Sequence, residues 1–243
     1  MQARAVAAGR GWAWFVDGWR MFARHPTVWL LLGLIFVFLM FVSLLIPVVG
    51  QLMFVLASPV LGAGMLYAAR ESNAARTPRV AHLWEGFRHP SARNRLFVLA
   101  AVALAGALAT SLLMSLLMRD VMLGMTGQPG AAMPDMNADF LLRLLIVLTP
   151  QLIVAMALAY AVPLVMFRGA AVGAALGSSL AASARNILPL LAFSLVYFAA
   201  AIVVSIPFGL GWLLLLPASV GMLYASYRDL YEPLDTPAST IAA

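Results

Sequence analysis

The chain has 243 residues, of which 64% are hydrophobic and only 10% are charged, and its formal net charge is +6. Soluble domains carry roughly 45–50% apolar and about 25% charged residues, so a water-soluble fold of this size could not bury so many apolar side chains. The sequence contains no cysteine, which excludes disulfides, thiol catalysis and thiolate metal sites. The composition therefore predicts a protein embedded in a lipid bilayer.

Six apolar runs are long enough to cross the hydrocarbon core, which takes about 20 helical residues. They cover residues 28–46, 52–69, 96–118, 144–167, 187–206 and 210–227, and none contains Asp, Glu, Arg or His. Short connections with proline and glycine follow the first and fifth runs, and tight turns there make each pair of neighbours an antiparallel hairpin. The predicted fold is all-α, a polytopic bundle of six transmembrane helices.

The arginines are distributed unequally between the two sides of this array. All fifteen basic residues are arginine, and thirteen fall in the segments that share a side with both chain ends, whereas only Arg119 and Arg143 fall on the other side. This excess predicts that both termini are cytoplasmic and that the protein lies in a bacterial inner membrane. Because the charge follows from topology and no nucleic-acid motif accompanies it, no nucleic-acid partner is predicted.

The segment before the first run, GWAWFVDGWRMFARHP, has an aromatic stripe. Trp12, Phe15, Trp19 and Phe22 share one helical face, which predicts a short amphipathic helix at the membrane interface. The chain is thereby divided into an interfacial N-terminal segment (1–26), a membrane domain (27–228) and a short cytoplasmic tail (229–243) that we expect to be disordered.

A second interfacial helix is expected between the fourth and fifth runs. Gly169, Gly173, Gly177 and Ala181 recur every fourth residue, so small side chains line one face of a helix there. We expect that face to pack closely against the bundle.

The stretch GMLYA occurs twice, at 64–68 and 221–225. Arg70 lies eleven residues after Pro59, and Arg228 lies eleven residues after Pro217. This match predicts a helical hairpin duplicated in parallel orientation, with an axis along the membrane normal. Ala-Arg-Asn precedes both the third run and the fifth, which leaves open whether the middle hairpin is a third copy.

Arginines and tyrosines at the cytoplasmic ends of the runs are candidates for lipid-headgroup contacts. An aromatic belt with arginines that reach toward phosphates is the structural interpretation, and contact with a headgroup or substrate is the functional one. The glycines at 62, 64 and 221 should let neighbouring helices approach closely. The headgroup candidates are Arg24, Arg70, Arg79, Arg93, Arg185, Arg228, Tyr67 and Tyr224.

Pro59, Pro163 and Pro217 lie inside the runs that return to the cytoplasmic side. Each frees the backbone carbonyl four residues earlier, at Val55, Ala159 and Leu213. Kinked packing, with these carbonyls satisfied locally by serine, threonine or water, is the favoured interpretation, and a midplane cavity is the alternative. The residues expected to line such a cavity are Ser58, Pro59, Pro163, Pro217 and Ser219.

Sites for catalysis or metals are scarce in this sequence. The runs contain no acid, histidine or arginine, so we predict no catalytic residue, no cofactor and no proton relay. The methionines of the outer loop form a weak Cu(I) candidate because thioethers are soft ligands, although methionine is also a common apolar filler. These methionines are Met122, Met125, Met133 and Met136. We expect no bound metal and no enzymatic activity.

Several segments of the chain resemble a known family. They are GWAWF and GWRMFARHP near the N-terminus, SARN at 183–186 and MLYASYRD at 222–229. On these segments the chain resembles uncharacterised proteobacterial inner-membrane proteins with six helices. The resemblance covers nearly the whole chain and implies the fold and the compartment, but the family has no assigned activity.

Two functions are consistent with these observations. The first is a non-enzymatic membrane component that binds anionic lipid headgroups, a partner membrane protein or a second copy of itself. The alternative is a small-solute channel or facilitator with a site near the three prolines. A water-accessible cavity at mid-depth would favour the channel, and a closed bundle would count against it.

Overall fold

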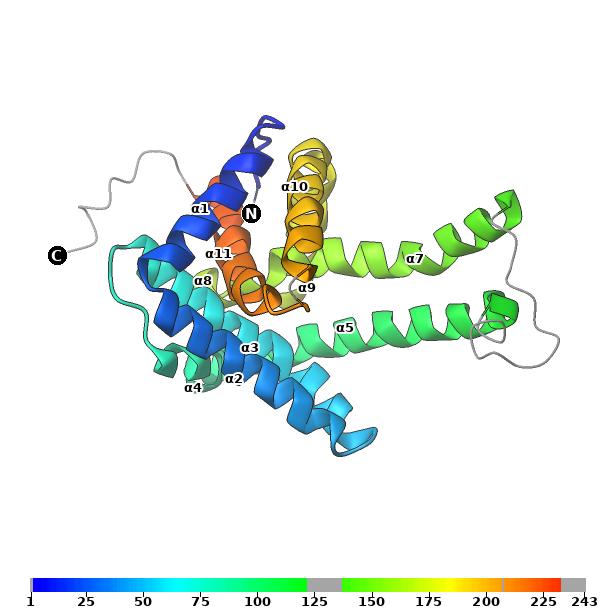
Figure 1. Cartoon of the computed structure of the whole chain (residues 1–243), viewed down its shortest axis with the longest axis horizontal. Helices are drawn as coiled ribbons and strands as arrows, with labels where there is room; N and C mark the ends of the chain where they lie inside the picture. The colour runs from blue at the N-terminus through cyan, green and yellow to red at the C-terminus, as the bar shows by residue number, and fades with distance from the viewer. Residues whose placement is uncertain (1, 122–136, 207, 233–243) are drawn as a thin grey trace.

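A computed structural model describes residues 2–121, 137–206 and 208–232, and this part of the chain is all-helical (Figure 1). The elements are α1 (Arg10–Arg24), α2 (Pro26–Leu44), α3 (Val49–Asn73), the 3-10 helix η1 (Val80–Trp84), α4 (Glu85–Arg88), α5 (Pro90–Leu117), α7 (Ala138–Ala159), α8 (Ala161–Arg168), α9 (Val172–Arg185), α10 (Ile187–Ser205) and α11 (Trp212–Tyr231). The predicted all-α class is confirmed.

Five helical stretches in the described residues are long and apolar enough to cross a membrane. They are Pro26–Leu44, Val49–Asn73, Pro90–Leu117, Ala138–Arg168 and Ile187–Ser205. The predicted sixth span corresponds to α11, which is not among them; its C-terminal half carries Arg228, Asp229 and several tyrosines. That half is also mostly buried, so α11 is a central helix of the bundle. The count of six spans stays a prediction.

The helix ends that the sequence assigned to the arginine-rich side lie together. Arg228 of α11 reaches both Asn73 at the end of α3 and Asp17 of α1. Arg95 of α5 donates to the carbonyls of Gly169 and Ala170 after α8, and Arg168 donates to the carbonyl of Tyr231. From this end the α5/α7 hairpin projects away from the other helices, with its two helices side by side (Figure 1).

The short helices pack in a cyclic order on the helices that return to this end. α1 packs mainly against α11 and also against α10. η1 and α4 pack against α3, and α9 packs against α7 and α8. Each short element therefore covers the returning helix of the hairpin before it, and α1 covers the returning helix of the last hairpin.

Glycines allow α1 to approach α10 and α11 at backbone distance. A Cβ on Gly18 would lie 2.6 Å from the Cα of Met222, and one on Gly11 would lie 2.6 Å from the backbone nitrogen of Phe193. The buried face of α1 also carries Trp14. Trp12 and Trp19 of the predicted aromatic stripe are 59% and 41% exposed, as an interfacial helix requires, whereas Phe22 of the same stripe is buried against the bundle.

The two GMLYA stretches use their glycine in the same way. A Cβ on Gly64 would lie 2.6 Å from the carbonyl oxygen of His82 in η1, and one on Gly221 would lie 3.0 Å from the carbonyl oxygen of Gly18 in α1. The prediction of close approach is confirmed at both positions. It is wrong at Gly62, where a Cβ would meet nothing within 4 Å.

The fourth predicted run is not one continuous helix. It breaks at Tyr160 into α7 and α8, because Pro163 has no N–H to bond the carbonyl of Ala159. The hydroxyl of Ser179 in α9 enters the break, where it accepts from the backbone N–H of Tyr160 at 2.9 Å and donates to the carbonyl of Met156 at 2.7 Å. A side chain from a neighbouring helix thus replaces part of the interrupted hydrogen-bond ladder.

The helix predicted between the fourth and fifth runs is present as α9, but its packing face was predicted wrongly. Gly173 and Gly177 are exposed, and a Cβ on either would meet nothing within 4 Å. The buried residues are Ala175, Ser179, Ala182 and Ser183. The bundle selects this face because the serine hydroxyls satisfy the carbonyl of Met156, which a glycine face could not do.

The proline in α3 is accommodated as the favoured interpretation predicts. The hydroxyl of Ser58 donates to the carbonyl of Val55, which Pro59 leaves without its helical partner, at 3.0 Å. At the other end of the bundle, α11 continues to Tyr231, three residues beyond the predicted end of the membrane domain. Residues 229–231 are buried and therefore belong to the bundle; residues 233–243 of the predicted tail lie outside the described part.

Candidate functional site

A buried carboxylate gathers the N-terminal segment at the arginine-rich end. Asp229 is 6% exposed and accepts from Nη2 of Arg4 at 2.8 Å, from Nε of Arg10 at 2.6 Å and from the indole N–H of Trp14 at 2.9 Å. Nε of Arg4 also donates to the backbone carbonyl of Asp229. We call Asp229, Arg4, Arg10 and Trp14 the Asp229 cluster.

The cluster keeps the carboxylate of Asp229 charged. Burial raises its pKa, but hydrogen bonds from Arg10 and Trp14 and the charges of Arg10 and Arg4 lower it by more, so that the pKa lies below its ordinary value. Two guanidinium groups and one indole donor satisfy the oxygens that burial removes from water. At neutral pH Asp229 is therefore a carboxylate that forms ion pairs with Arg4 and Arg10.

A buried amide fixes the same segment from the side of α10. Asn186 is fully buried; its side-chain oxygen accepts from the backbone N–H of Val6 at 2.9 Å, and its amide donates to the carbonyl of Arg4 at 3.1 Å. The backbone N–H of Arg4 in turn donates to the carbonyl of Leu230 at 3.0 Å. The chain before α1 is thus held across the ends of α10 and α11.

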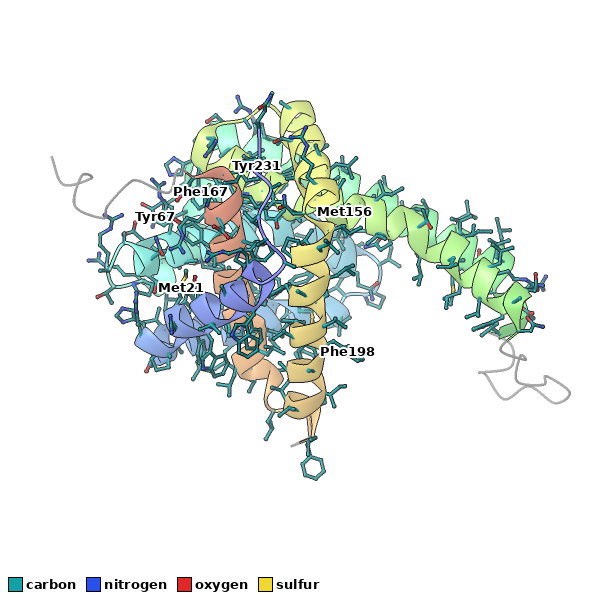
Figure 2. The ribbon with its side chains drawn as sticks, turned by 90° about the horizontal axis from the view of Figure 1, so that it is seen from above. Met21, Tyr67, Met156, Phe167, Phe198 and Tyr231 are labelled. Carbon is teal, nitrogen blue, oxygen red and sulfur yellow. The ribbon has the colours of Figure 1, made fainter. Side chains whose placement is uncertain are left out.

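Aromatic side chains fill the space between α8 and α11 beside the cluster. Phe167 contacts the rings of Tyr224 and Tyr227, and Tyr231 contacts those of Tyr227 and Tyr160. The guanidinium of Arg70 lies 5.2 Å from the centroid of Phe167, and that of Arg168 lies 5.7 Å from the centroid of Tyr231 (Figure 2 labels Phe167 and Tyr231). The centre of the described bundle is therefore closed by rings at this end.

The predicted headgroup residues divide into three sets in the structure. Arg24, Arg79 and Arg185 are exposed, and they form no ion pair within the described residues. Arg93 and Tyr67 are half-buried, and the ring of Tyr67 meets His82 edge-on at 5.2 Å. The remaining three face other parts of the chain: Arg70 lies on Phe167, Arg228 contacts Asp17 and Asn73, and Tyr224 is buried.

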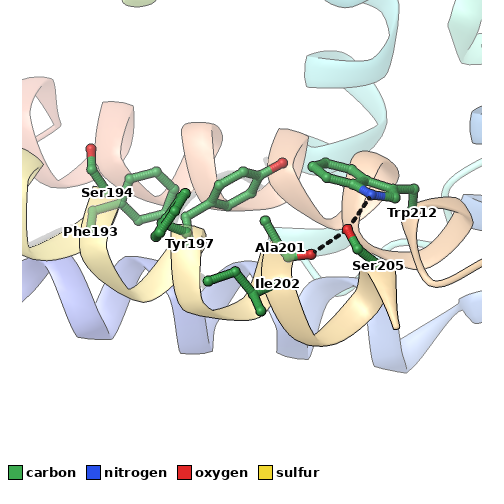
Figure 3. A pocket seen from close by; sticks show the side chains of 8 residues that line it. Phe193, Ser194, Tyr197, Ala201, Ile202, Ser205 and Trp212 are labelled. Carbon is green, nitrogen blue, oxygen red and sulfur yellow. Dashed lines mark hydrogen bonds between the residues drawn. The ribbon is translucent and has the colours of Figure 1, made fainter. Parts of the chain in front are cut away.

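The residues predicted to line a midplane cavity do not line the recess that the structure describes in the spans. Ser58, Pro59 and Ser219 are half-buried, Pro163 and Pro217 are buried, and the hydroxyl of Ser219 donates to Leu216 of its own helix. The recess is an open apolar groove of about 660 Å³ along α10 (Figure 3). It is lined by Phe193, Ser194, Tyr197, Phe198, Ala201, Ile202, Ser205 and Trp212.

The outer end of the α5/α7 hairpin holds a small polar recess of about 190 Å³. Arg143 lies there 2.5 Å from a carboxylate oxygen of Asp139 and 3.4 Å from one of Asp120. The candidate copper ligands Met122, Met125, Met133 and Met136 lie outside the described residues. Met118, just before them, is buried.

Sequence reasoning missed the Asp229 cluster, although a signal for it was present. A carboxylate in the last turn of a helix faces the negative end of the helix dipole, which disfavours it. Asp229 occupies that position in α11, so its presence calls for a specific cationic partner. The partners could not be named, because Arg4 and Arg10 lie more than 200 residues away in the sequence.

Comparisons with known proteins agree with a membrane location. The chain is 30% identical over 118 residues to a probable inner membrane protein of Burkholderia thailandensis, an alignment that covers 46% of this chain and 44% of that protein. The chain therefore matches less than half the length of this relative. No family model matches the chain, and no solved structure matches it. The relative confirms the resemblance to inner-membrane proteins of unassigned activity, and together with the apolar helices it supports a multi-pass inner-membrane protein.

Proposed function

We propose that this protein is a non-enzymatic membrane component that binds anionic phospholipids through its arginine-rich end. One observation carries the proposal: Arg24, Arg79 and Arg185 are exposed there without an ion pair among the described residues. Exposed tryptophans, Trp12 and Trp19, lie on α1 at the same end. Exposed guanidinium groups and exposed indoles are the side chains that the headgroup layer attracts.

The size of the expected effect follows from the number of unpaired arginines. A basic side chain near an anionic leaflet contributes about 1 kcal/mol, so three such side chains contribute about 3 kcal/mol. That energy corresponds to a preference of roughly 100-fold for anionic over zwitterionic lipid. Arg70 and Arg228 contribute less in this proposal, because Phe167, Asp17 and Asn73 already occupy their guanidinium groups.

The test compares a triple variant with a control at the other end of the molecule. Arg24, Arg79 and Arg185 are replaced together by Gln, and Arg119→Gln serves as the control because Arg119 is exposed on the predicted outer side. Each protein is placed in nanodiscs of mixed phosphatidylglycerol and phosphatidylcholine, and the lipids retained on extraction are counted by native mass spectrometry. The triple variant should lose its preference for phosphatidylglycerol while Arg119→Gln keeps it. Equal retention by all three proteins would refute the proposal.

The proposed orientation places both termini and the arginine-rich end in the cytoplasm, with six spans. The unequal arginine distribution supports it, and so does the meeting of all the corresponding helix ends at one end of the bundle. We propose the part of α11 up to Tyr227 as the sixth span, shielded from lipid along its buried half by α1, α2 and α3.

We also propose that the bundle consists of three units, each a short helix followed by a hairpin. Their ranges are 10–73, 80–168 and 172–231. Two observations support this. The short elements pack in cyclic order on the returning helices, and the glycine of each GMLYA contacts the backbone of the short element of the following unit. Units in one orientation around an axis along the membrane normal would produce this order.

A further inference from the structure

Gln151 carries the amide side chain that lies furthest from the ends of a membrane-spanning helix in the described residues. This residue lies on α7 and is exposed, and its side-chain amide forms no hydrogen bond in the part of the chain that the structure describes. It lies eight residues after Arg143, which places it about 12 Å into the span at 1.5 Å per residue. A primary amide at that depth in hydrocarbon loses its hydrogen bonds to water without replacement, which is costly.

The surroundings of Gln151 form a face suited to another helix. Leu141, Leu145, Leu148 and Leu152 follow one another at spacings of four, three and four residues, and each is between 49% and 64% exposed. This spacing is that of the seam of a left-handed coiled coil. Gln151 stands next to Leu152, so its amide flanks the seam and can reach a group on a helix packed there.

The rest of the molecule leaves this face uncovered. α7 packs against α5, α8 and α9, whereas α7 and α10 have almost no contact in the described residues. The two equivalent seams elsewhere, α3 with α5 and α11 with α2, are packed. The hairpin of α5 and α7 projects from the bundle in both views, so a second molecule could reach its outer face (Figures 1 and 2).

We propose that the α7 face formed by Leu141, Leu145, Leu148, Leu152 and Gln151 is the interface of a homodimer with a twofold axis along the membrane normal. A second copy inserted in the same orientation necessarily places its own Gln151 at the same depth. An amide carries both a donor and an acceptor, so two identical amides satisfy each other across a twofold axis. The leucine seam supplies the packing around this pair, and the pair fixes its register.

Single cysteines test the interface directly, because the natural chain has none. Leu148→Cys places one thiol in the seam, and the control Leu195→Cys places one on α10, where the leucine is 72% exposed to the surroundings. Oxidation in membranes by a lipid-soluble copper complex should yield a disulfide-linked dimer of the Leu148→Cys protein and little of the Leu195→Cys protein. Equal cross-linking of the two, or cross-linking of Leu148→Cys only to a different protein, would overturn the proposal.

A second measurement isolates the amide. Gln151→Leu removes the polar group while it makes the span more apolar, so insertion is retained, and Gln151→Asn keeps an amide. Loss of an interhelical hydrogen bond of this kind should weaken dimerisation about 3- to 30-fold, measured by energy transfer between labelled copies as the protein-to-lipid ratio is varied. Gln151→Asn should retain more of the dimer than Gln151→Leu. A Gln151→Leu protein that dimerises as well as the natural chain would refute the role of the amide.

Discussion

Replacing Gly18 by alanine should destabilise the bundle, although the same substitution in an exposed helix stabilises it. A Cβ on Gly18 would lie 2.6 Å from the Cα of Met222, whereas ordinary contacts of a Cβ begin at about 3.4 Å. The backbone nitrogen of Met222 would lie closer still, and backbone cannot turn aside as a flexible side chain can, so α1 and α11 would have to separate by more than about 0.8 Å at their crossing. That separation loosens the packing of Gly221 against Gly18 as well.

The magnitude follows from two opposing effects. Overpacking of a close contact costs about 1–3 kcal/mol, and replacement of a helical glycine by alanine gains about 0.5–1 kcal/mol through the helix propensity. At Gly177 of α9 only the gain applies, because a Cβ there meets nothing within 4 Å. The free energies of unfolding of Gly18→Ala and Gly177→Ala should therefore differ by roughly 1–3 kcal/mol, with the natural protein between them.

The assay is unfolding in mixed micelles by titration with sodium dodecyl sulfate, followed by tryptophan fluorescence. Trp14, one of the six tryptophans that contribute to this signal, is buried on the same face of α1 as Gly18. Gly177→Ala is the matched control, with the same atoms added to a helix of the same protein. If Gly18→Ala unfolds at the same concentration as Gly177→Ala, the α1/α11 crossing is not a tight contact and the reasoning fails.

Three further predictions concern other parts of the bundle. Because folding lowers the pKa of Asp229, its ion pairs should contribute their full stability at pH values above its ordinary pKa of 3.8. This stability should be lost as the pH falls through the lowered pKa of the folded state. Asp229→Asn should show no such loss at acid pH when its thermal unfolding is measured. Ser179→Ala should lower the free energy of unfolding by about 1–3 kcal/mol in the same detergent titration, because it removes the hydroxyl that bridges the break between α7 and α8. Ser219→Ala should change it by no more than about 0.5 kcal/mol. Equal effects of the two substitutions would contradict the role of the bridge. Reporter domains fused after Arg119 and after the C-terminus should lie on opposite sides of the membrane, and a result on the same side would refute the six-span prediction.

The sequence was sufficient for those features that depend on local composition. Apolar runs and the prolines and glycines between them predicted the helices and their pairing, because lipid requires each span to satisfy its own backbone. The glycines of GMLYA were predicted as contact points, and the structure gives each of them a neighbouring backbone. The repeated sequence GMLYA is informative because a close approach of two helix backbones requires glycine at the contact in each copy.

The missed features depend on residues that are far apart in the chain. The break in α7 follows from Pro163, but Ser179, which fills it, belongs to the next helix. The partners of Asp229 lie near the other terminus. No helical periodicity relates such positions, and α9 shows the consequence: its glycine stripe is regular, yet the bundle packs on the serine face because hydroxyls were needed there.

The closure of α1 onto α11 has a consequence for biosynthesis. Trp14 and Asp229 are 215 residues apart, and at a synthesis rate of about 5–20 residues per second the ribosome needs roughly 10–40 s to make the intervening chain. For most of that interval neither α10 nor α11, the helices against which α1 packs, has been made. We expect its exposed tryptophans to hold α1 at the bilayer surface until then. The packing of the first helix is therefore completed only when the last hairpin has been synthesised.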